Sequence, residues 1–237
     1  MILFAAAYSA AVTTVTIKPR NVIDNTNGVD VIDNKLAVTG YSYIDQIREG
    51  NIPGHEFLHV RGHSHVVGAV DQELSALSTA GFGNWPAAAA GAVLVSTSEQ
   101  DVVAGTGARS IIIRGLDANW VSATATVVPT GDTPTAATSQ TFIRVYEIEV
   151  VTAGSGHTND GDITLSISGT NIIKMFEDHS TSEAGRRTVP AGKVMYLENL
   201  EGSAIGNKEV TYHVFCRNNA IADSPFLLRA SWHSKDG

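Results

Sequence analysis

The 237-residue chain is poor in cysteine and in charged residues, and both shortages limit the classes of protein to which it can belong. Cys216 is the only cysteine, so no disulfide can form within one chain and folding needs no oxidising compartment. It lies in the alternating run TYHVFCR, which predicts a buried structural thiol rather than a nucleophile. Charged residues make up 17% of the chain and hydrophobic residues 43%, a balance that supports a packed core and excludes disorder.

Clustered basic charge and long apolar runs are also missing. The net charge is −8 and Arg186-Arg187 is the only arginine doublet, which excludes the phosphate-neutralising surface of a nucleic-acid partner. The N-terminal run MILFAAAYSAAVTT is too short to cross a bilayer, so we expect no membrane partner. It lacks the basic start of a secretory signal, and we interpret it as an ordered arm or first strand, with a cleaved signal as the alternative.

What the chain does contain is a regular rhythm of short strands. No long amphipathic helix is present, and runs rich in Val, Ile and Thr alternate with turns of Gly, Asn and Asp. This spacing predicts an all-β fold, an antiparallel β-sandwich or jelly roll. Within residues 141–152 the alternation changes phase, which indicates a β-bulge. The strands are expected at residues 92–96, 109–115, 120–128, 141–152, 162–168, 171–177, 193–199, 208–217 and 226–232.

The first fifty residues have a different character. They combine strand-like pieces, VTTVTIKP and VDVID, with one helical candidate, SYIDQIREG, in which Ile44 and Ile47 share a face and Gly50 could end the helix. Pro53-Gly54 then breaks the chain. We therefore expect an N-terminal arm with a short helix over residues 1–54 and a β-sandwich domain over residues 55–237.

One motif raises the question of catalysis. Residues 55–65, HEFLHVRGHSH, match the zinc-protease signature H-E-x-x-H-x-x-G-x-x-H, with His55, His59 and His65 as ligands and Glu56 as base. Such a site needs a long helix, but Pro53-Gly54 lies directly before the motif and no Met-turn follows it. We expect no catalytic or metal site and no cofactor here, with a non-catalytic metal site or a pH-sensitive cluster as alternatives.

Three other features favour structural roles. Residues 154–162, GSGHTNDGD, could offer oxygen ligands to Ca²⁺, but their spacing does not fit an EF-hand and we expect a hairpin loop. The glycine-rich AGTGA at residues 104–108 lacks the Lys-Ser/Thr of a P-loop and predicts a turn. Trp85, Trp120 and Trp232 are expected to anchor the core or an interface, and sugar-binding platforms are the alternative.

Several short sequence segments, taken in their order along the chain, carry a resemblance to a known family. They are VAGTGAR at 103–109, IRGLDAN at 113–119, TFIRV at 141–145, VTAGS at 151–155, GDIT at 161–164 with ISGT at 167–170, and TVPAGK at 188–193. Over roughly residues 55–200 the chain resembles virion structural proteins of tailed phages from marine and environmental samples. In such proteins a G-H-x-x-x-H-x-x-G phrase precedes the first sandwich strands, and Gly54, His55, His59 and Gly62 fit that place.

The resemblance implies a virion component rather than an enzyme, assembled in the host cytoplasm. Within that class we expect a capsid decoration protein that forms a homo-oligomer, a trimer, and docks on the major capsid protein or other virion proteins. A neck, tail or host-surface-binding component is the first alternative, and a glycan-binding module using exposed tryptophans would belong there. A zinc metallopeptidase using the histidine motif is the second.

Overall fold

A computed structural model describes residues 2–3, 30–32, 35–37, 43–56, 58–64, 74, 77, 85–197, 199–203, 209–219, 221 and 224–235. The chain forms two compact units, one of Met1–Tyr8 with Val60–Gly237 and the other of Ser9–His59. The expected division after residue 54 stays a prediction.

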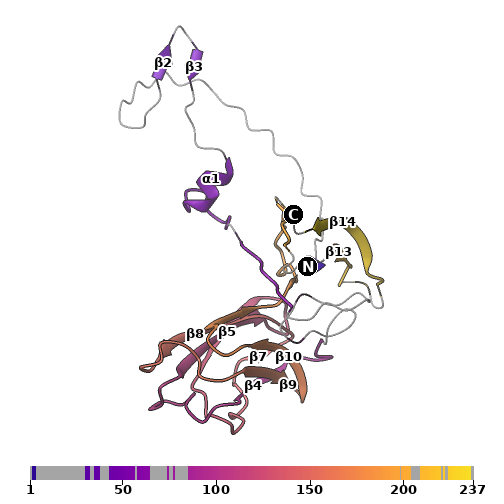
Figure 1. Cartoon of the computed structure of the whole chain (residues 1–237). Helices are drawn as coiled ribbons and strands as arrows, with labels where there is room; N and C mark the ends of the chain where they lie inside the picture. Colours follow the sequence, from indigo (N-terminus) through magenta and orange to yellow (C-terminus); the bar gives the residue numbers. More distant parts are fainter. Residues whose placement is uncertain are drawn as a thin grey trace. The chain divides into compact units, whose positions relative to one another are not determined.

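The larger unit contains two four-stranded antiparallel sheets (Figure 1). This all-β architecture confirms the predicted fold class. The first sheet has the order β10-β9-β4-β7, and its strands are β4 (Ala90–Ser96), β7 (Thr141–Phe142), β9 (Ile163–Ile167) and β10 (Thr170–Met175). The second has the order β11-β8-β5-β6, and its strands are β5 (Ala108–Leu116), β6 (Ser122–Val127), β8 (Arg144–Ala153) and β11 (Thr181–Glu183).

The core follows from strict alternation along these strands. In β9 every second residue, Ile163, Leu165 and Ile167, is fully buried while the residues between are half-buried. Successive side chains of a strand point to opposite faces, so each sheet presents one apolar face. The buried apolar cluster of the described residues draws all its members from residues 92–184.

The segment 141–153 joins the two sheets. Its start, β7, pairs with β4 in the first sheet, and its continuation, β8, pairs with β5 in the second. The ladder between β5 and β8 shifts register between Arg114 and Gly115, which pair with Glu147 and Val145. The phase change in the sequence is therefore a bulge, as predicted.

The remaining pairings are small. β13 (Glu209–Cys216) and β14 (Leu227–Lys235) form an antiparallel hairpin, as the predicted strands at 208–217 and 226–232 require. β1 (Ile2–Leu3) lies parallel to β12 (Arg186–Arg187), and β2 (Asp30–Ile32) pairs with β3 (Lys35–Ala37). The expected strand at 12–19 lies outside the described residues.

Two sequence predictions need correction here, and two short strands were missed. Residues 193–197 and 199 form no strand, although 193–199 was predicted as one; Val194, Tyr196 and Leu197 are exposed. The short strands β11 and β12 were not predicted, because TSE and RR carry no apolar pattern. Cys216 is half-buried on β13 rather than buried.

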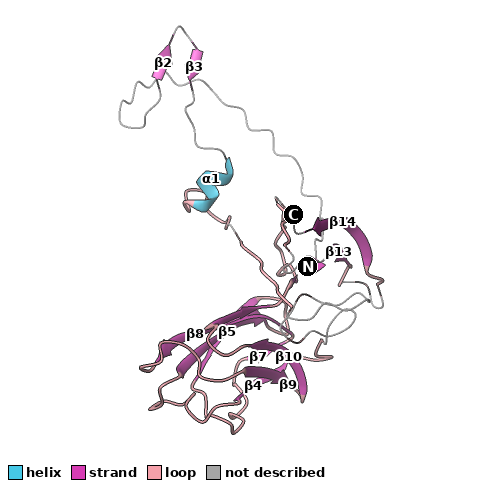
Figure 2. Cartoon of the chain, viewed as in Figure 1, coloured by secondary structure: helices cyan, strands magenta, loops and turns pink. Residues whose placement is uncertain are grey.

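The predicted helix is present as α1 (Tyr43–Arg48), the helix drawn in cyan in Figure 2. Gly50 adopts the left-handed φ of +76° and donates its N–H to the Ile47 carbonyl, which ends the helix where Gly50 was expected to end it. Among the residues that the structure describes, no helix combines the length and apolar character of a bilayer span.

Candidate functional site

The histidine motif is not built on a helix. Residues 53–54 form a turn, and residues 55–56 and 58–64 have no regular secondary structure, so the spacing of one helical turn between His55 and His59 does not apply. His55, Glu56 and His59 are exposed, and His65 lies outside the described residues. Within the described part of the chain, no three His, Cys, Asp or Glu side chains gather as a metal site would require. The absence of catalysis here stays a prediction.

A histidine inside the motif, but not among its expected ligands, packs on the sandwich. The His63 ring lies 5.8 Å from the ring of His179 in a parallel stack and 5.7 Å from the ring of Phe176. Phe176 and His179 follow directly after β10. His63 thus contacts two rings that follow β10.

The loop at 154–162 does not close a hairpin. It leads from β8 in the second sheet to β9 in the first, which corrects the prediction. Its residues Asp160 and Gly161 donate their backbone N–H groups to the carboxylate of Asp101, over 2.9 and 3.1 Å. Asp101 is fully buried and also accepts hydrogen bonds from the Ala108 N–H at 2.7 Å and the Ser96 hydroxyl at 2.6 Å.

Four donors therefore occupy the Asp101 carboxylate, and backbone amides take the places that a calcium ion would need. Burial of an ionised carboxylate is tolerated only with such compensation. Gly107 lies in the predicted glycine-rich turn, and a Cβ there would overlap the same carboxylate. Asp101 therefore connects these loops and has a structural role.

A second polar cluster contains a buried cation. The Arg144 side chain is 6% exposed, and its guanidinium lies 4.3 Å from the ring centre of Trp85 and 4.9 Å from that of Trp120. Arg186, 2% exposed, stacks on the same Trp85 ring at 4.5 Å. Cation–π contact of this kind stabilises desolvated cations by about 2 kcal/mol.

Burial, followed by repulsion from Arg217 and Arg186, lowers the pKa of Arg144 to about 10. Trp85 and Trp120 thus support buried arginines, in keeping with the anchor role that the sequence suggested. Trp232 stacks on Tyr212 at 5.1 Å between ring centres. The positions of the arginines around Trp85 could not be read from the sequence, because their partners come from distant strands.

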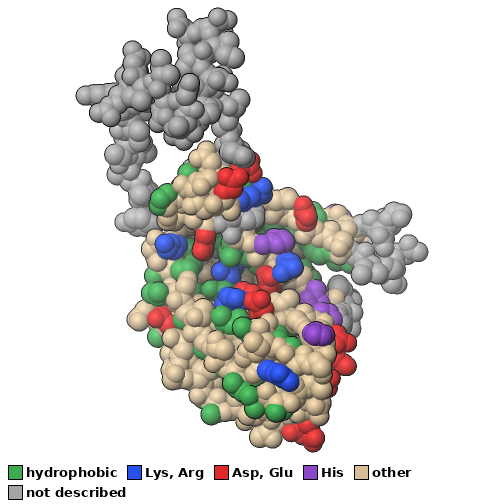
Figure 3. All heavy atoms as spheres, turned by 90° about the vertical axis from the view of Figure 1, so that its left-hand side faces the viewer, with side chains coloured by type: hydrophobic (Ala, Val, Ile, Leu, Met, Phe, Trp, Pro, Cys, Tyr) green, Lys and Arg blue, Asp and Glu red, His purple; other side chains and the backbone are tan. Residues whose placement is uncertain are grey.

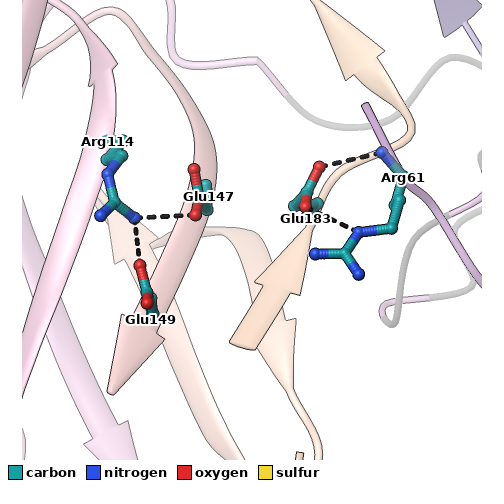
Figure 4. Close-up of polar contacts among 5 residues, drawn as sticks. All are labelled: Arg61, Arg114, Glu147, Glu149 and Glu183. Atoms are coloured by element: carbon teal, nitrogen blue, oxygen red, sulfur yellow. Dashed lines mark hydrogen bonds and ion pairs between the residues drawn. The ribbon is translucent and has the colours of Figure 1, made fainter. Parts of the chain in front are cut away.

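The outer face of the second sheet carries a network of ion pairs (Figure 4). Nη1 of Arg114 on β5 donates to Glu147 at 2.7 Å and to Glu149 at 2.5 Å, both on β8. Glu183 on β11 accepts hydrogen bonds from the backbone N–H and the Nε of Arg61. Figure 3 shows basic, acidic and histidine side chains interspersed on one face of the molecule.

The pKa values of Arg114 and Glu147 are both raised, for different reasons. The pKa of Arg114 is raised, since its two carboxylates outweigh burial. The pKa of Glu147 is also raised, because burial and then the neighbouring Glu183 and Glu149 outweigh the attraction of Arg114. The ion pairs therefore link side chains of β5 and β8 and give this face of the sheet a mixed charge.

Comparison of the chain with protein-family models, with curated proteins and with solved structures gives no match.

Proposed function

We propose that this protein is a non-catalytic structural subunit of a tailed-phage particle. In this proposal it is a capsid decoration protein that associates with copies of itself, as a trimer, and docks on the major capsid protein. The phrases that carry the resemblance support it. They lie at the turns and strand ends that shape the sandwich, among them the turn before β5, the passage from β7 to β8 and the β9–β10 hairpin.

The division of the chain is the observation that carries the proposal. The described core of the sandwich draws on residues 92–184 alone, while Ser9–His59 form a compact unit of their own. A domain whose core is complete leaves such a segment available for contacts with other subunits. Arms of this kind increase the area buried between neighbours, at roughly 25 cal/mol per Å² of apolar surface.

Two features favour this function over its rivals. The faces of Trp85 and Trp120 are occupied by arginine guanidinium groups, which leaves less room for the sugar stacking of a glycan-binding module. The histidine motif lacks the helix that a zinc peptidase uses to aim two ligands at one ion.

The test is mass spectrometry of purified phage particles, followed by imaging of the intact particle. We expect peptides of this chain in stoichiometric amounts and density at a symmetric position on the capsid. Absence from the particle would contradict the proposal. Stoichiometric tight zinc, with peptidase activity lost in Glu56→Ala, would establish the enzyme in its place.

A further inference from the structure

The four strands that end the two sheets differ in how well they are protected. An edge strand exposes unpaired backbone N–H and C=O groups, and proteins protect such edges by shortness, charge, proline or bulges. β7 has two residues and β11 has three. β10 has six, but its ladder is broken by a bulge between Asn171 and Ile173 and it carries Lys174.

The fourth edge, β6, has none of these protections. Its six residues, SATATV, pair with β5 on one side in a continuous register from Ser122–Leu116 to Val127–Ile111. Residues 121–128 contain no charged residue, no proline and no bulge. Val121 and Val128, at the two ends of the strand, are 52% and 50% exposed.

A groove of about 530 Å³ lies beside this edge. Residues 124–128 form one wall, and residues 130, 135–136 and 138–140 form the other. All of these lining residues are Thr, Ser, Ala, Val or Gln, so the groove is uncharged. Small and hydroxyl-bearing walls beside an open strand edge fit an extended segment of backbone, whose main chain supplies the hydrogen bonds.

We propose that β6 accepts residues 12–17 of a second copy of this chain as an added strand. The sequence VTTVTI has the length of β6, consists only of residues that favour strands, and is uncharged like the groove. Each chain carries a net charge of −8, and a contact between an uncharged segment and an uncharged groove adds no local charge repulsion to that between the copies. Residues 12–17 belong to the Ser9–His59 unit, separate from the unit that contains β6.

This inference rests on the self-association in the proposed function and names its contact surface. The first test adds charge to the edge in the full-length protein, with Thr124→Lys and Thr126→Lys together. The matched control, Thr152→Lys with Thr181→Lys, adds the same charge to other strands of the same sheet. We expect the edge variant to weaken self-association at least tenfold in Kd and the control to stay within twofold. The unfolding midpoints of both should be unchanged at concentrations at which the chain is monomeric. Equal effects of the two variants would overturn the proposal.

A cross-link identifies the occupant of the edge. In a Cys216→Ser background, copies with Thr124→Cys are mixed with copies carrying Thr13→Cys, Thr14→Cys or Thr16→Cys. We expect oxidation to give mixed dimers with at least one of the three. Dimers of Thr124→Cys copies alone would show two β6 edges paired with each other. In a chain that carries both Thr124→Cys and Thr14→Cys, a disulfide formed only within one chain would show an intramolecular contact. Either result overturns the proposal.

Failure here is distinguishable from failure of the proposed function. If particles contain the protein but the edge lysines leave its oligomer unchanged, the proposed contact surface is wrong and the virion role stands. If the edge lysines weaken the oligomer but the protein is absent from particles, the contact surface stands and the virion role is wrong.

Discussion

At the scale of single residues, the structure depends on buried charges with well-defined partners. Asp101 joins three segments, because its carboxylate accepts from Ser96, from Ala108 and from the loop that carries Asp160 and Gly161. An isolated buried carboxylate would be costly, but four donors compensate for the lost water. Its partners lie up to 60 residues away, so the sequence around Asp101 gives no sign of this role.

We expect Asp101→Asn to lower the free energy of unfolding by about 2–4 kcal/mol. The Ser96 hydroxyl can turn to accept from an amide, but the backbone N–H of Gly161 cannot, so a buried donor loses its acceptor in either orientation of the new side chain. Urea denaturation measures the change. Asp132→Asn, on an exposed loop, is the control and should stay within about 0.5 kcal/mol of the wild type. Equal stabilities of the two variants would contradict the role of Asp101.

Glu147 leads to a prediction about pH. Its pKa is raised in the folded protein, so the stability contributed by its protonated form is fully present below pH 4.5 and is lost as pH rises through the folded-state pKa. We expect Glu147→Gln to be as stable as the wild type at pH 4 and more stable than the wild type at pH 7. Thermal unfolding across this range measures the difference.

The control for Glu147→Gln is Glu99→Gln, which makes the same change in net charge at an exposed glutamate. A pH-independent difference, or a Glu147→Gln protein clearly less stable than the wild type at pH 7, would show that the pairing with Arg114 outweighs burial.

At the scale of elements, the sequence predicts strands well and their partners poorly. Val, Ile and Thr mark β4, β5, β8 and β9, because a buried strand needs an alternating apolar side. The same pattern at 193–199 predicts a strand wrongly, since the described residues there find no strand to pair with. Turn residues at 154–162 reveal a reversal of the chain, but whether the next strand joins the same sheet depends on long-range packing.

The candidate site was predictable only in part. The residue types and spacing of the histidine motif suggested a metal centre. Pro53-Gly54, directly before the motif, already indicated that the helix required by such a centre would not form. The ion-pair network and the buried arginines depend on which strands become neighbours, as Arg114 and Glu147 show. The open edge of β6 depends on sheet order, which no local pattern encodes.

Two glycines allow steric overlap and backbone strain to be tested separately. A Cβ on Gly115 would overlap the Arg144 carbonyl oxygen at the bulge, so Gly115→Ala should cost about 3 kcal/mol or more. Gly169, in the two-residue turn between β9 and β10, has φ +77° and open space around it, so Gly169→Ala should cost about 1–2 kcal/mol through backbone strain alone. Urea midpoints of both variants test this order, and the reverse order would contradict the packing described at the bulge.

At the scale of the whole molecule, the two units predict separable stability and assembly. Ile2 and Leu3 pair with β12 of the larger unit, so a deletion that tests the Ser9–His59 unit, called the arm below, should leave these two residues in place. We expect replacement of Ser9–His59 by a short Gly-Ser linker to leave the sandwich folded, because its described core uses none of these residues. Circular dichroism should keep its β character, and the thermal midpoint of a dilute sample should change little.

The same replacement should abolish or strongly weaken self-association. The Ser9–His59 unit supplies the segment proposed to pair with β6, so its replacement removes one partner of the proposed contact. Light scattering at micromolar concentration, with the full-length chain and the edge-lysine variant beside it, measures the effect. Full-length oligomers with truncated monomers would support exchange of the arm. Truncated chains that associate as tightly as the full-length protein would show that the sandwich alone makes the contacts, and that the arm serves another purpose.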